Sequence, residues 1–413
     1  MLTLEKAVEI LRDSAEPVQD KERIPLIEAS GRVLAEDITA PMDQPPFPRS
    51  PLDGYAVRGE DTLSASRECP VTLEVIGKIY AGEVFHGKVE KGQCVRLMTG
   101  APIPEGADTV IRQEDTDYGE ARKANPVRIF RGSEPWKNYC YAGEDYKKGD
   151  ILLRAGTVLN GDRIGIAAGS GDDMVTVYRE PRISVISTGD EVISPGEPIR
   201  PGKIYDSNRY LLAGRLGDLG LGEINSSHCP DRIGDMCERI REAAKTSDLI
   251  ITTGGVSVGE KDIMHGVMEE LGAEKLFWKI SLKPGSPTLA FTIERKKTGS
   301  FSGSDRIPVI CLTGNPYGVA VNFELLVRPV MEKITGNSAW LCPKRLCLLE
   351  NDSPKRGGIR RFMRGSFTEG RVRILTGSHA SGTLSSMADC SCLVEIGEGS
   401  SGKAGEEVWT YIL

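Results

Sequence analysis

The pattern of apolar and polar positions predicts a helix at the start of the chain. Apolar side chains recur along residues 4–11 at the spacing of one helical face, and Thr3, just before them, is a residue type that caps helix N-termini. Residues 40–50 (APMDQPPFPRS) hold four prolines, which disfavour helix and central strand. We therefore expect an extended linker there and a new domain that begins near Pro51.

Short β-type runs then alternate with Gly, Pro and Asn turn signals as far as about Tyr146. Among them are VTLEVIGKIYA, CVRLMTG and TVIRQED. This pattern predicts a small β-rich domain over residues 46–142. The following segment mixes short strands with a helix, and we expect it to rejoin the first helix in a discontinuous N-terminal and hinge domain of residues 1–45 and 143–180.

From Arg182 onward, strands alternate with amphipathic helices. The helices are expected around residues 208–219, 233–245, 262–271 and 322–334. This alternation predicts a three-layer α/β domain with a parallel sheet over residues 181–336. Short strands return after Gly336 and predict a C-terminal β-barrel, or failing that a sandwich, over residues 337–413. The expected fold class is multidomain α/β and β.

Composition narrows the classes of function. A net charge of −7 disfavours broad nucleic-acid binding, because neutralising phosphates requires a basic face. No apolar run approaches the roughly 18 residues of a membrane helix, and the acidic N-terminus is unlike a secretory signal. We expect a cytoplasmic protein without nucleic-acid or membrane partners.

The ten cysteines and four histidines match no zinc, disulfide or triad spacing, so carboxylates, lysines and backbone amides are expected to carry the chemistry.

Three glycine-rich loops follow β-type runs in the α/β segment. They are residues 187–191 (STGDE), 252–259 (TTGGVSVG) and 312–316 (LTGNP). Loops at the carboxyl ends of parallel strands meet at the ligand crevice, and small residues let backbone amides approach an anion. One such loop could be a simple turn, but three of them favour a site for an anionic ligand.

Carboxylates cluster in and around the same loops. Asp190 and Glu191 belong to the first loop, Asp231 lies in an HCPDRIG turn, and Asp262 follows the second loop. Mg²⁺ prefers oxygen ligands and often bridges to substrate phosphate, so these acids could hold a metal over a pyrophosphate. Each could instead cap a helix, and Asp262 is the most ambiguous because it stands at a predicted helix entrance.

Two lysines precede a Pro-Gly turn in the segment WKISLKPGSP. Lys279 and Lys283 lie four residues apart there and could neutralise an oxyanion. Lysines on loops are also commonly just solvated, so this pattern alone does not assign a site.

Together these segments resemble the molybdopterin molybdenumtransferase family, which includes the gephyrin E-domain. The resemblance extends over almost the whole chain. It is carried by PLDGYAV (51–57), MTGAPIPEGAD (98–108), AGED (142–145), STGDE, IYDSN (204–208), GGVSVGEKD (254–262), WKISLKPG (278–285), TGNP and SGTLSSM (381–387). Each motif alone is modest, but their order and spacing are specific.

The resemblance implies both an assembly and a reaction. It implies four domains per subunit and a homodimer, with each active site shared between the α/β domain of one subunit and the DGYA domain of the other. The implied substrates are molybdate and adenylated molybdopterin, which is cleaved with the help of Mg²⁺ so that molybdate is inserted and AMP is released. A molybdopterin adenylyltransferase is the expected protein partner.

Roles carry over from the resemblance residue by residue. The catalytic positions are Asp53 and Thr99, which reach in from the partner subunit, Glu144 and Asp145 of the hinge segment, and Lys279 and Lys283 of the oxyanion pocket. The cofactor-binding positions are Gly254, Gly255, Ser257, Asp262 and Asn315 around the pterin and phosphates, with Arg364 and Ser381 in the oxyanion pocket. The metal positions are Asp190, Glu191 and Asp231.

The chain departs from the family pattern at three places. KPGKP reads KPGSP, so that Ser286 replaces a lysine, and PGNPVS reads TGNPYG, with Thr313, Tyr317 and Gly318. The arginine-rich stretch before GED is NYCYA (138–142). Because at least two cations are missing, the alternative is a paralogue that is non-catalytic, as a carrier or scaffold, or that handles tungstate. A nucleotide-processing hydrolase would explain TTGGVSVG but not the DGYA or SGTLSSM segments.

Overall fold

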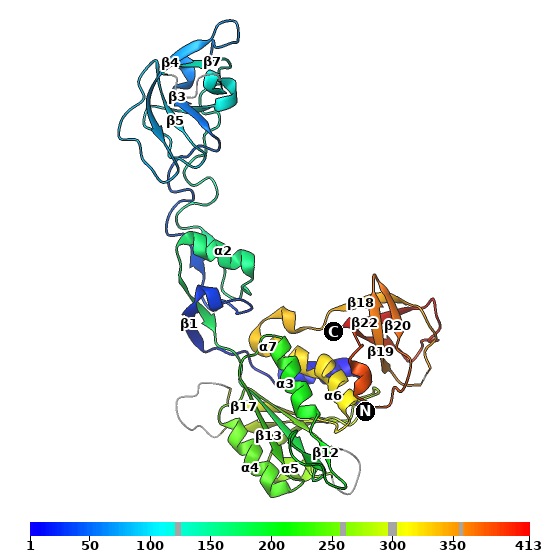
Figure 1. The fold of residues 1–413 in the computed structure, drawn as a ribbon. Helices are drawn as coiled ribbons and strands as arrows, with labels where there is room; N and C mark the ends of the chain where they lie inside the picture. Colours follow the sequence, from blue (N-terminus) through cyan, green and yellow to red (C-terminus); the bar gives the residue numbers. More distant parts are fainter. Residues whose placement is uncertain (120–124, 257–261, 296–303, 355–357) are drawn as a thin grey trace. The chain divides into compact units, whose positions relative to one another are not determined.

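The chain folds into two compact units, each of which is discontinuous in sequence. The computed structural model describes residues 1–119, 125–256, 262–295, 304–354 and 358–413 (Figure 1). Unit 1 comprises Met1–Glu36, Gly156–Gly161 and Met174–Leu413, and unit 2 comprises Asp37–Ala155 and Asp162–Asp173.

A six-stranded sheet forms the centre of unit 1, in the order β13-β10-β14-β17-β16-β15. Its strands are β10 (Ile183–Thr188), β13 (Ile224–Cys229), β14 (Leu249–Thr253), β15 (Glu274–Trp278), β16 (Leu289–Glu294) and β17 (Arg306–Leu312). The first four strands in this order are parallel, whereas β16 and β15 each run antiparallel to the strand before them. The predicted α/β domain is confirmed, but its sheet is mixed rather than all parallel.

Helices cover both faces of this sheet (Figure 1). One face carries α1 (Leu4–Asp13), α3 (Asn208–Asp218), α6 (Pro316–Asn322) and α7 (Arg328–Thr335), and the other carries α4 (Ile233–Ala244) and α5 (Met264–Glu270). Their apolar side chains form two separate buried clusters because the sheet lies between them. The helices predicted at 208–219 and 233–245 are confirmed.

The first helix forms as its sequence pattern predicts. Thr3 Oγ1 accepts a hydrogen bond from the backbone N–H of Lys6 at 3.3 Å, which satisfies one free donor of the first turn. Leu4, Ala7 and Leu11 are buried in the same cluster as α7 and the sheet. This helix therefore contributes to the core of the α/β domain.

The last helix of the domain begins earlier than predicted. It starts with Pro316 as α6, passes through one π-helical turn, η5 (Phe323–Val327), and continues as α7. Proline suits a first helical position, where its missing N–H costs nothing. The prediction at 322–334 missed this start because TGNP reads as a turn.

Three smaller β structures complete unit 1. β11 (Val192–Ile193) pairs parallel with β12 (Ile204–Tyr205). β1 (Lys21–Pro25) pairs antiparallel with β9 (Met174–Tyr178), which joins two segments distant in sequence. The C-terminal strands are β18 (Lys344–Leu349), β19 (Arg361–Thr368), β20 (Arg371–Ile374), β21 (Cys392–Ile396) and β22 (Glu407–Ile412). They close into a barrel in the order β18-β20-β19-β21-β22, as predicted.

Unit 2 contains the predicted β-rich region. Its five-stranded sheet has the order β6-β3-β5-β4-β7. The strands are β3 (Gly54–Val57), β4 (Val71–Ile79), β5 (Gln93–Leu97), β6 (Thr109–Arg112) and β7 (Val127–Ile129). Alternate residues of β3 enter two different cores, Tyr55 and Val57 in one and Ala56 in the other. Besides this sheet, β2 (Ile38–Thr39) pairs with β8 (Ile151–Leu153), and α2 spans Gly161–Ser170.

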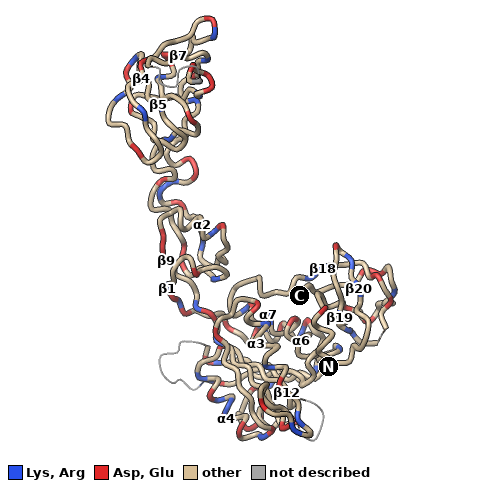
Figure 2. Tube along the Cα trace, in the orientation of Figure 1, with Lys and Arg blue, Asp and Glu red and all other residues tan. Residues whose placement is uncertain are grey.

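Charges of both signs are interspersed along the described trace (Figure 2). Of the helices in the described part of the chain, none is both long and apolar enough to span a membrane.

Candidate active site

The three glycine-rich loops meet at the carboxyl ends of β10, β14 and β17, as predicted. The Gly254 N–H donates to the Leu312 carbonyl at 3.1 Å. Gly254 has a φ of 94°, and a Cβ there would lie 2.5 Å from the Thr188 carbonyl oxygen. A Cβ on Gly314 would lie 3.7 Å from the Gly254 Cα. Glycine at 254 thus lets three backbone segments approach one another, which is where open α/β sheets bind ligands.

Two of the three predicted metal positions lie together. The Asp190 N–H donates to Asp231 Oδ2, and the Asp231 N–H donates to Asp190 Oδ1, both at 3.3 Å. Thr188 Oγ1 also donates to Asp231 Oδ1, at 2.7 Å. The Glu191 carboxylate instead folds back toward Gly189, since a Cβ on Gly189 would lie 2.9 Å from Glu191 Oε2.

This donor set fits only one mode of metal binding. Within the described ranges, no group of three or more His, Cys, Asp or Glu side chains could hold a metal ion. Mg²⁺, however, usually binds through one or two carboxylates together with substrate phosphate. Asp190 and Asp231 fit a magnesium ion that is held jointly by protein and substrate, and do not fit a closed protein site.

The second loop supplies backbone groups and one carboxylate. The Met264 N–H donates to the Gly255 carbonyl at 3.2 Å and to Asp262 Oδ1 at 3.3 Å. Burial raises the pKa of Asp262, while the nearby His265 lowers it. Asp262 therefore bonds to the first turn of α5, which begins at Met264 and not at 262 as predicted. Ser257 lies outside the described residues.

A buried polar network, which the sequence pattern does not indicate, lies under the first loop. Ser187 Oγ donates to Asp206 Oδ2 at 2.5 Å and lies 3.2 Å from His228 Nδ1. Asp206, from the IYDSN motif, also pairs with Arg209 at 3.1 Å. Asn208, the last residue of the same motif, donates its side-chain amide to the Gly314 carbonyl at 2.9 Å. The motif thus joins the ends of β10 and β13 to α3 and the TGNP loop.

A cavity of about 420 Å³ lies where the KPGSP turn, the TGNP loop and the barrel meet. Its polar lining includes Lys283, Thr313, Asn315, Arg361, His379 and Ser381. None of its described lining residues is acidic. Of the residues expected in an oxyanion pocket, Lys283 and Ser381 line this cavity, and so does Asn315.

Lys279 does not line this cavity. Its Nζ lies 5.2 Å from the centre of the Trp278 ring, which makes an edge-to-face contact with His265 at 4.7 Å. The structure therefore does not place Lys279 and Lys283 together in this pocket. Residues four apart lie on one face of a regular helix or strand, and residues 279–283 form neither.

Arg364 does not line this cavity either. Its side chain is fully buried, and its terminal nitrogens donate to the carbonyls of Ser378 at 3.2 Å, Ala380 at 3.4 Å and also Thr383. Its guanidinium lies over the ring of Tyr317, and burial lowers the pKa of Arg364. These contacts tie the guanidinium to the loop that carries Ser381.

Arg361 and His379 line the cavity without having been singled out from the sequence. His379 Nε2 lies 2.8 Å from the Leu375 carbonyl oxygen. Arg361 belongs to the run Arg360-Arg361-Phe362-Met363-Arg364. No local signal distinguishes which of its arginines faces a cavity, because the barrel that orients them forms from distant strands.

In unit 2, two predicted residues contact each other directly. The backbone N–H and the hydroxyl of Thr99 both donate to Asp53 Oδ1 at 2.7 Å, and these bonds lower the pKa of Asp53. Glu144 and Asp145 are both exposed. Glu144 Oε2 accepts a hydrogen bond from the Tyr141 N–H at 3.0 Å, which holds the turn of residues 141–144 just before Asp145.

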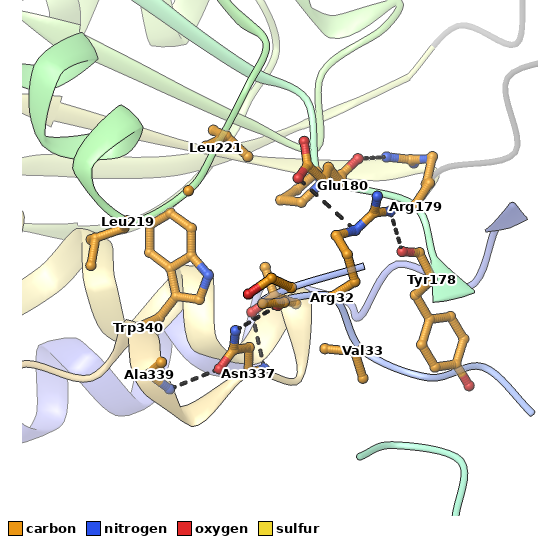
Figure 3. A pocket seen from close by; sticks show the side chains of 15 residues that line it. Arg32, Val33, Tyr178, Arg179, Glu180, Leu219, Leu221, Asn337, Ala339 and Trp340 are labelled. Atoms are coloured by element: carbon orange, nitrogen blue, oxygen red, sulfur yellow. Dashed lines mark hydrogen bonds and ion pairs between the residues drawn. The ribbon is translucent and has the colours of Figure 1, made fainter. Parts of the chain in front are cut away.

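In a second cavity of unit 1, of about 180 Å³, several polar groups are already paired (Figure 3). The Asn337 amide donates to the Gly31 carbonyl at 3.1 Å and its oxygen accepts the Ala339 N–H at 2.9 Å. Arg32 donates to the Tyr178 carbonyl at 2.8 Å. These bonds indicate a structural junction between the β1–β9 ribbon and the α/β domain.

Family models match the chain in three consecutive parts. Residues 2–171 match the MoeA N-terminal region (domain I and II), residues 184–333 a probable molybdopterin binding domain, and residues 348–413 the MoeA C-terminal region (domain IV).

Curated relatives and solved structures agree with these matches. The molybdopterin molybdenumtransferase of Bacillus subtilis (strain 168) is 35% identical over 401 residues, which cover 95% of this chain and 90% of the relative. That of Haemophilus influenzae is 34% identical over 399 residues, with 95% and 94% covered. The crystal structure of a molybdopterin biosynthesis moeA protein from Pyrococcus horikoshii OT3 is 31% identical, covers 100% of both chains and has a TM-score of 0.81. The chain belongs to the molybdopterin molybdenumtransferase family.

Proposed function

We propose that this chain inserts molybdate into adenylated molybdopterin and releases AMP. The observation that carries the proposal is the cavity beside the converging loops, whose described lining contains basic, hydroxyl and amide groups but no acid. Molybdate is a dianion and is best held by charge-assisted hydrogen bonds. Lys283 and Ser381 would bind it, together with Asn315 of the TGNP loop.

The loops would hold the rest of the substrate. Gly254 and Gly255 let the second loop pack closely against Thr188, and the backbone amides of this loop would bind the phosphates. Asp190 and Asp231 would hold Mg²⁺ jointly with those phosphates, and Thr188 keeps the Asp231 carboxylate oriented. When bound, Mg²⁺ neutralises charge on the phosphoanhydride. We propose that Glu191 joins these two acids at the metal. Asp262 and Ser257 are proposed to bind the pterin and phosphate part of the substrate.

We further propose a homodimer in which Asp53 and Thr99 of one copy complete the site of the other. The half-buried Asp53 carboxylate accepts two hydrogen bonds from Thr99, so it is oriented before any partner binds. Glu144 and Asp145 would serve the same site from the hinge segment. A molybdopterin adenylyltransferase is the proposed supplier of substrate. All ten cysteines are free thiols, which suits a reducing compartment such as the cytoplasm.

The test is AMP release from adenylated molybdopterin by the purified full chain. Reactions would contain Mg²⁺ with molybdate, tungstate or neither, and a parallel set would contain EDTA. Release that requires both Mg²⁺ and molybdate is the expected result. Absence of AMP release under every condition, with the substrate still bound, would contradict the proposal and favour a carrier.

A tungstate-selective enzyme is the second candidate. It is favoured by Ser286, which lines the cavity where the family pattern has a lysine, so the electrostatics around the bound oxyanion differ. Faster AMP release with tungstate than with molybdate would establish it.

A further inference from the structure

Three aromatic side chains form an exposed cluster in unit 2, at and just before the segment NYCYA. In this aromatic cluster, the Trp136 ring makes an edge-to-face contact with Tyr139, with ring centres 5.2 Å apart. The rings of Trp136 and Tyr141 are inclined by only 23°, with centres 6.0 Å apart, and those of Tyr139 and Tyr141 lie 4.8 Å apart. Trp136 is 55% exposed and Tyr141 49% exposed, so the cluster presents aromatic surface to solvent.

Hydrogen bonds to neighbouring strand residues hold the cluster in this exposed position. The Trp136 N–H donates to the Asp108 carbonyl at 2.9 Å, and the Val110 N–H donates to the Lys137 carbonyl at 3.1 Å. The Asn138 side-chain amide donates to the Val110 carbonyl at 2.8 Å. Trp136 has a φ of 68° and Asn138 a φ of 54°, and this left-handed backbone is unfavourable for a residue as bulky as tryptophan. A fixed, unfavourable conformation that leaves a large apolar ring in solvent favours a role in binding.

The cluster lies beside residues of unit 2 that are proposed for the site. Cys140, between the two tyrosines, exchanges two backbone hydrogen bonds with Arg49, at 3.0 and 3.1 Å. The next residue, Ser50, accepts a hydrogen bond from the Gly100 N–H at 2.8 Å, so these contacts continue into the loop of Thr99. The AGED turn follows the cluster directly in sequence. The rings therefore belong to the part of unit 2 to which substrate binding is assigned.

Adenine is the one part of the proposed substrate for which the glycine loops and the cavity do not account. We propose that the aromatic cluster binds this adenine ring, and that of the released AMP, by stacking against its two exposed rings, Trp136 and Tyr141. This inference rests on the proposed function for the identity of the ligand. A purine is planar and has π-faces, so it stacks on aromatic side chains without requiring a particular set of hydrogen-bond donors.

The test measures AMP binding to the full chain by calorimetry and by tryptophan fluorescence, with ribose 5-phosphate as the probe that lacks a base. Trp136→Ala and Tyr141→Ala each remove one ring, whereas Trp136→Phe keeps a ring and removes only the indole. The chain has four tryptophans, so the quenching that belongs to Trp136 is the part that Trp136→Phe abolishes. Trp409→Ala is the matched control, because Trp409 is an exposed tryptophan of the barrel. Thermal unfolding of each variant separates loss of fold from loss of affinity.

AMP should quench Trp136 in the parent, and ribose 5-phosphate should bind more weakly without quenching. Trp136→Ala should weaken AMP binding about fivefold or more, as expected for a lost stacking contact with a base. Tyr141→Ala should weaken it to a smaller extent, while Trp136→Phe and Trp409→Ala should bind AMP nearly as the parent does.

Parental AMP affinity in either alanine variant of the cluster would overturn the proposal. If such a variant also melts earlier, the rings only pack against one another. A parent that binds no AMP, or that binds ribose 5-phosphate as tightly as AMP, would overturn it as well.

The same set separates this inference from the proposed function. If the parent binds AMP through Trp136 but releases no AMP from adenylated molybdopterin, the transferase proposal fails and the adenine site stands. If the parent releases AMP from that substrate and Trp136→Ala binds AMP like the parent, the opposite holds.

Discussion

The guanidinium of Arg364, on barrel strand β19, lies 3.5 Å from the centre of the ring of Tyr317, on helix α6 of the α/β domain. The same tyrosine donates its hydroxyl to the Phe362 carbonyl at 2.8 Å and its backbone N–H to the Ser381 carbonyl at 3.0 Å. Phe362 and Ser381 both line the cavity. One buried tyrosine thus links two walls of the cavity.

Replacing Tyr317 with phenylalanine should destabilise this junction. The ring contact with Arg364 would remain, but the buried Phe362 carbonyl would lose its donor, which costs about 1–3 kcal/mol. We expect a lower melting temperature and faster hydrogen exchange in residues 361–364. Tyr210→Phe is the matched control, because Tyr210 is exposed yet also lies beside an arginine, Arg209. Equal stability of the two variants would show that the hydroxyl contributes nothing.

Substitutions at two of the proposed metal positions, Asp231 and Glu191, should affect the metal requirement and not the fold. Asp231→Asn and Glu191→Gln should raise the Mg²⁺ concentration needed for half-maximal AMP release, because each removes a charged oxygen ligand, and loop carboxylates rarely stabilise a core. Melting temperatures should stay close to the parental value. Asp235→Asn, on an exposed position of α4, is the control. If both variants need no more Mg²⁺ than the parent, the metal binds elsewhere.

The sequence predicted the layers of the fold better than the direction of every strand. Helices α3 and α4 show the apolar spacing of a surface helix, so their positions could be predicted closely. In contrast, β16 (LAFTIE) is buried on both faces and reads as a uniform apolar run. Such a run carries no information on whether it lies parallel or antiparallel to β17. The antiparallel edge follows from tertiary pairing alone.

The site shows the same limit. The glycine loops converge as predicted, because strand order forces the carboxyl ends of parallel strands together. That Arg361 lines the cavity could not be predicted, since alternation along a strand assigns faces only once the position of the strand in the barrel is known. The position of Lys279 was missed for a related reason. Its φ of 65° is unusual for a lysine and breaks the local pattern.

The contact between Asp53 and Thr99 should be visible in a titration. The Thr99 N–H and O–H stabilise the ionised carboxylate, so the folded pKa of Asp53 lies below its ordinary value. The stabilisation is fully present above the unfolded pKa and is lost as the pH falls through the folded pKa. Thr99→Val removes the hydroxyl and keeps the N–H, so the pKa should rise part of the way back. Carboxyl NMR would measure it, with Thr39→Val as control; an unchanged pKa would contradict the assignment.

Mixed variants would test the shared site. Asp53→Asn and Lys283→Ala should each be nearly inactive alone, and the protein should have the mass of a dimer. Co-expression should restore roughly a quarter of parental activity, because half of randomly formed twofold dimers carry one site with neither change. The control is co-expression of Asp190→Asn with Lys283→Ala, two changes that both lie in the α/β and barrel unit. Each site of such a mixed dimer carries one change, so no activity should return. The two mixtures therefore differ only if Asp53 serves the partner. Failure of the first mixture to recover any activity would oppose a shared site.

The most direct electrostatic test restores the missing ammonium. Ser286 lines the cavity, and its hydroxyl donates to the Ile280 carbonyl at 2.7 Å, so Ser286→Lys loses one hydrogen bond and adds one positive charge. In a partly shielded pocket the added attraction to a dianion is weakly screened and should outweigh that loss. We expect half-saturation of AMP release at a severalfold lower molybdate concentration, with a larger effect at low salt. Ser286→Gln loses the same small side chain without adding charge, and it should not strengthen binding. If Ser286→Lys leaves the half-saturating concentration unchanged while Lys283→Ala also has no effect, the KPGSP turn is structural and the oxyanion binds elsewhere.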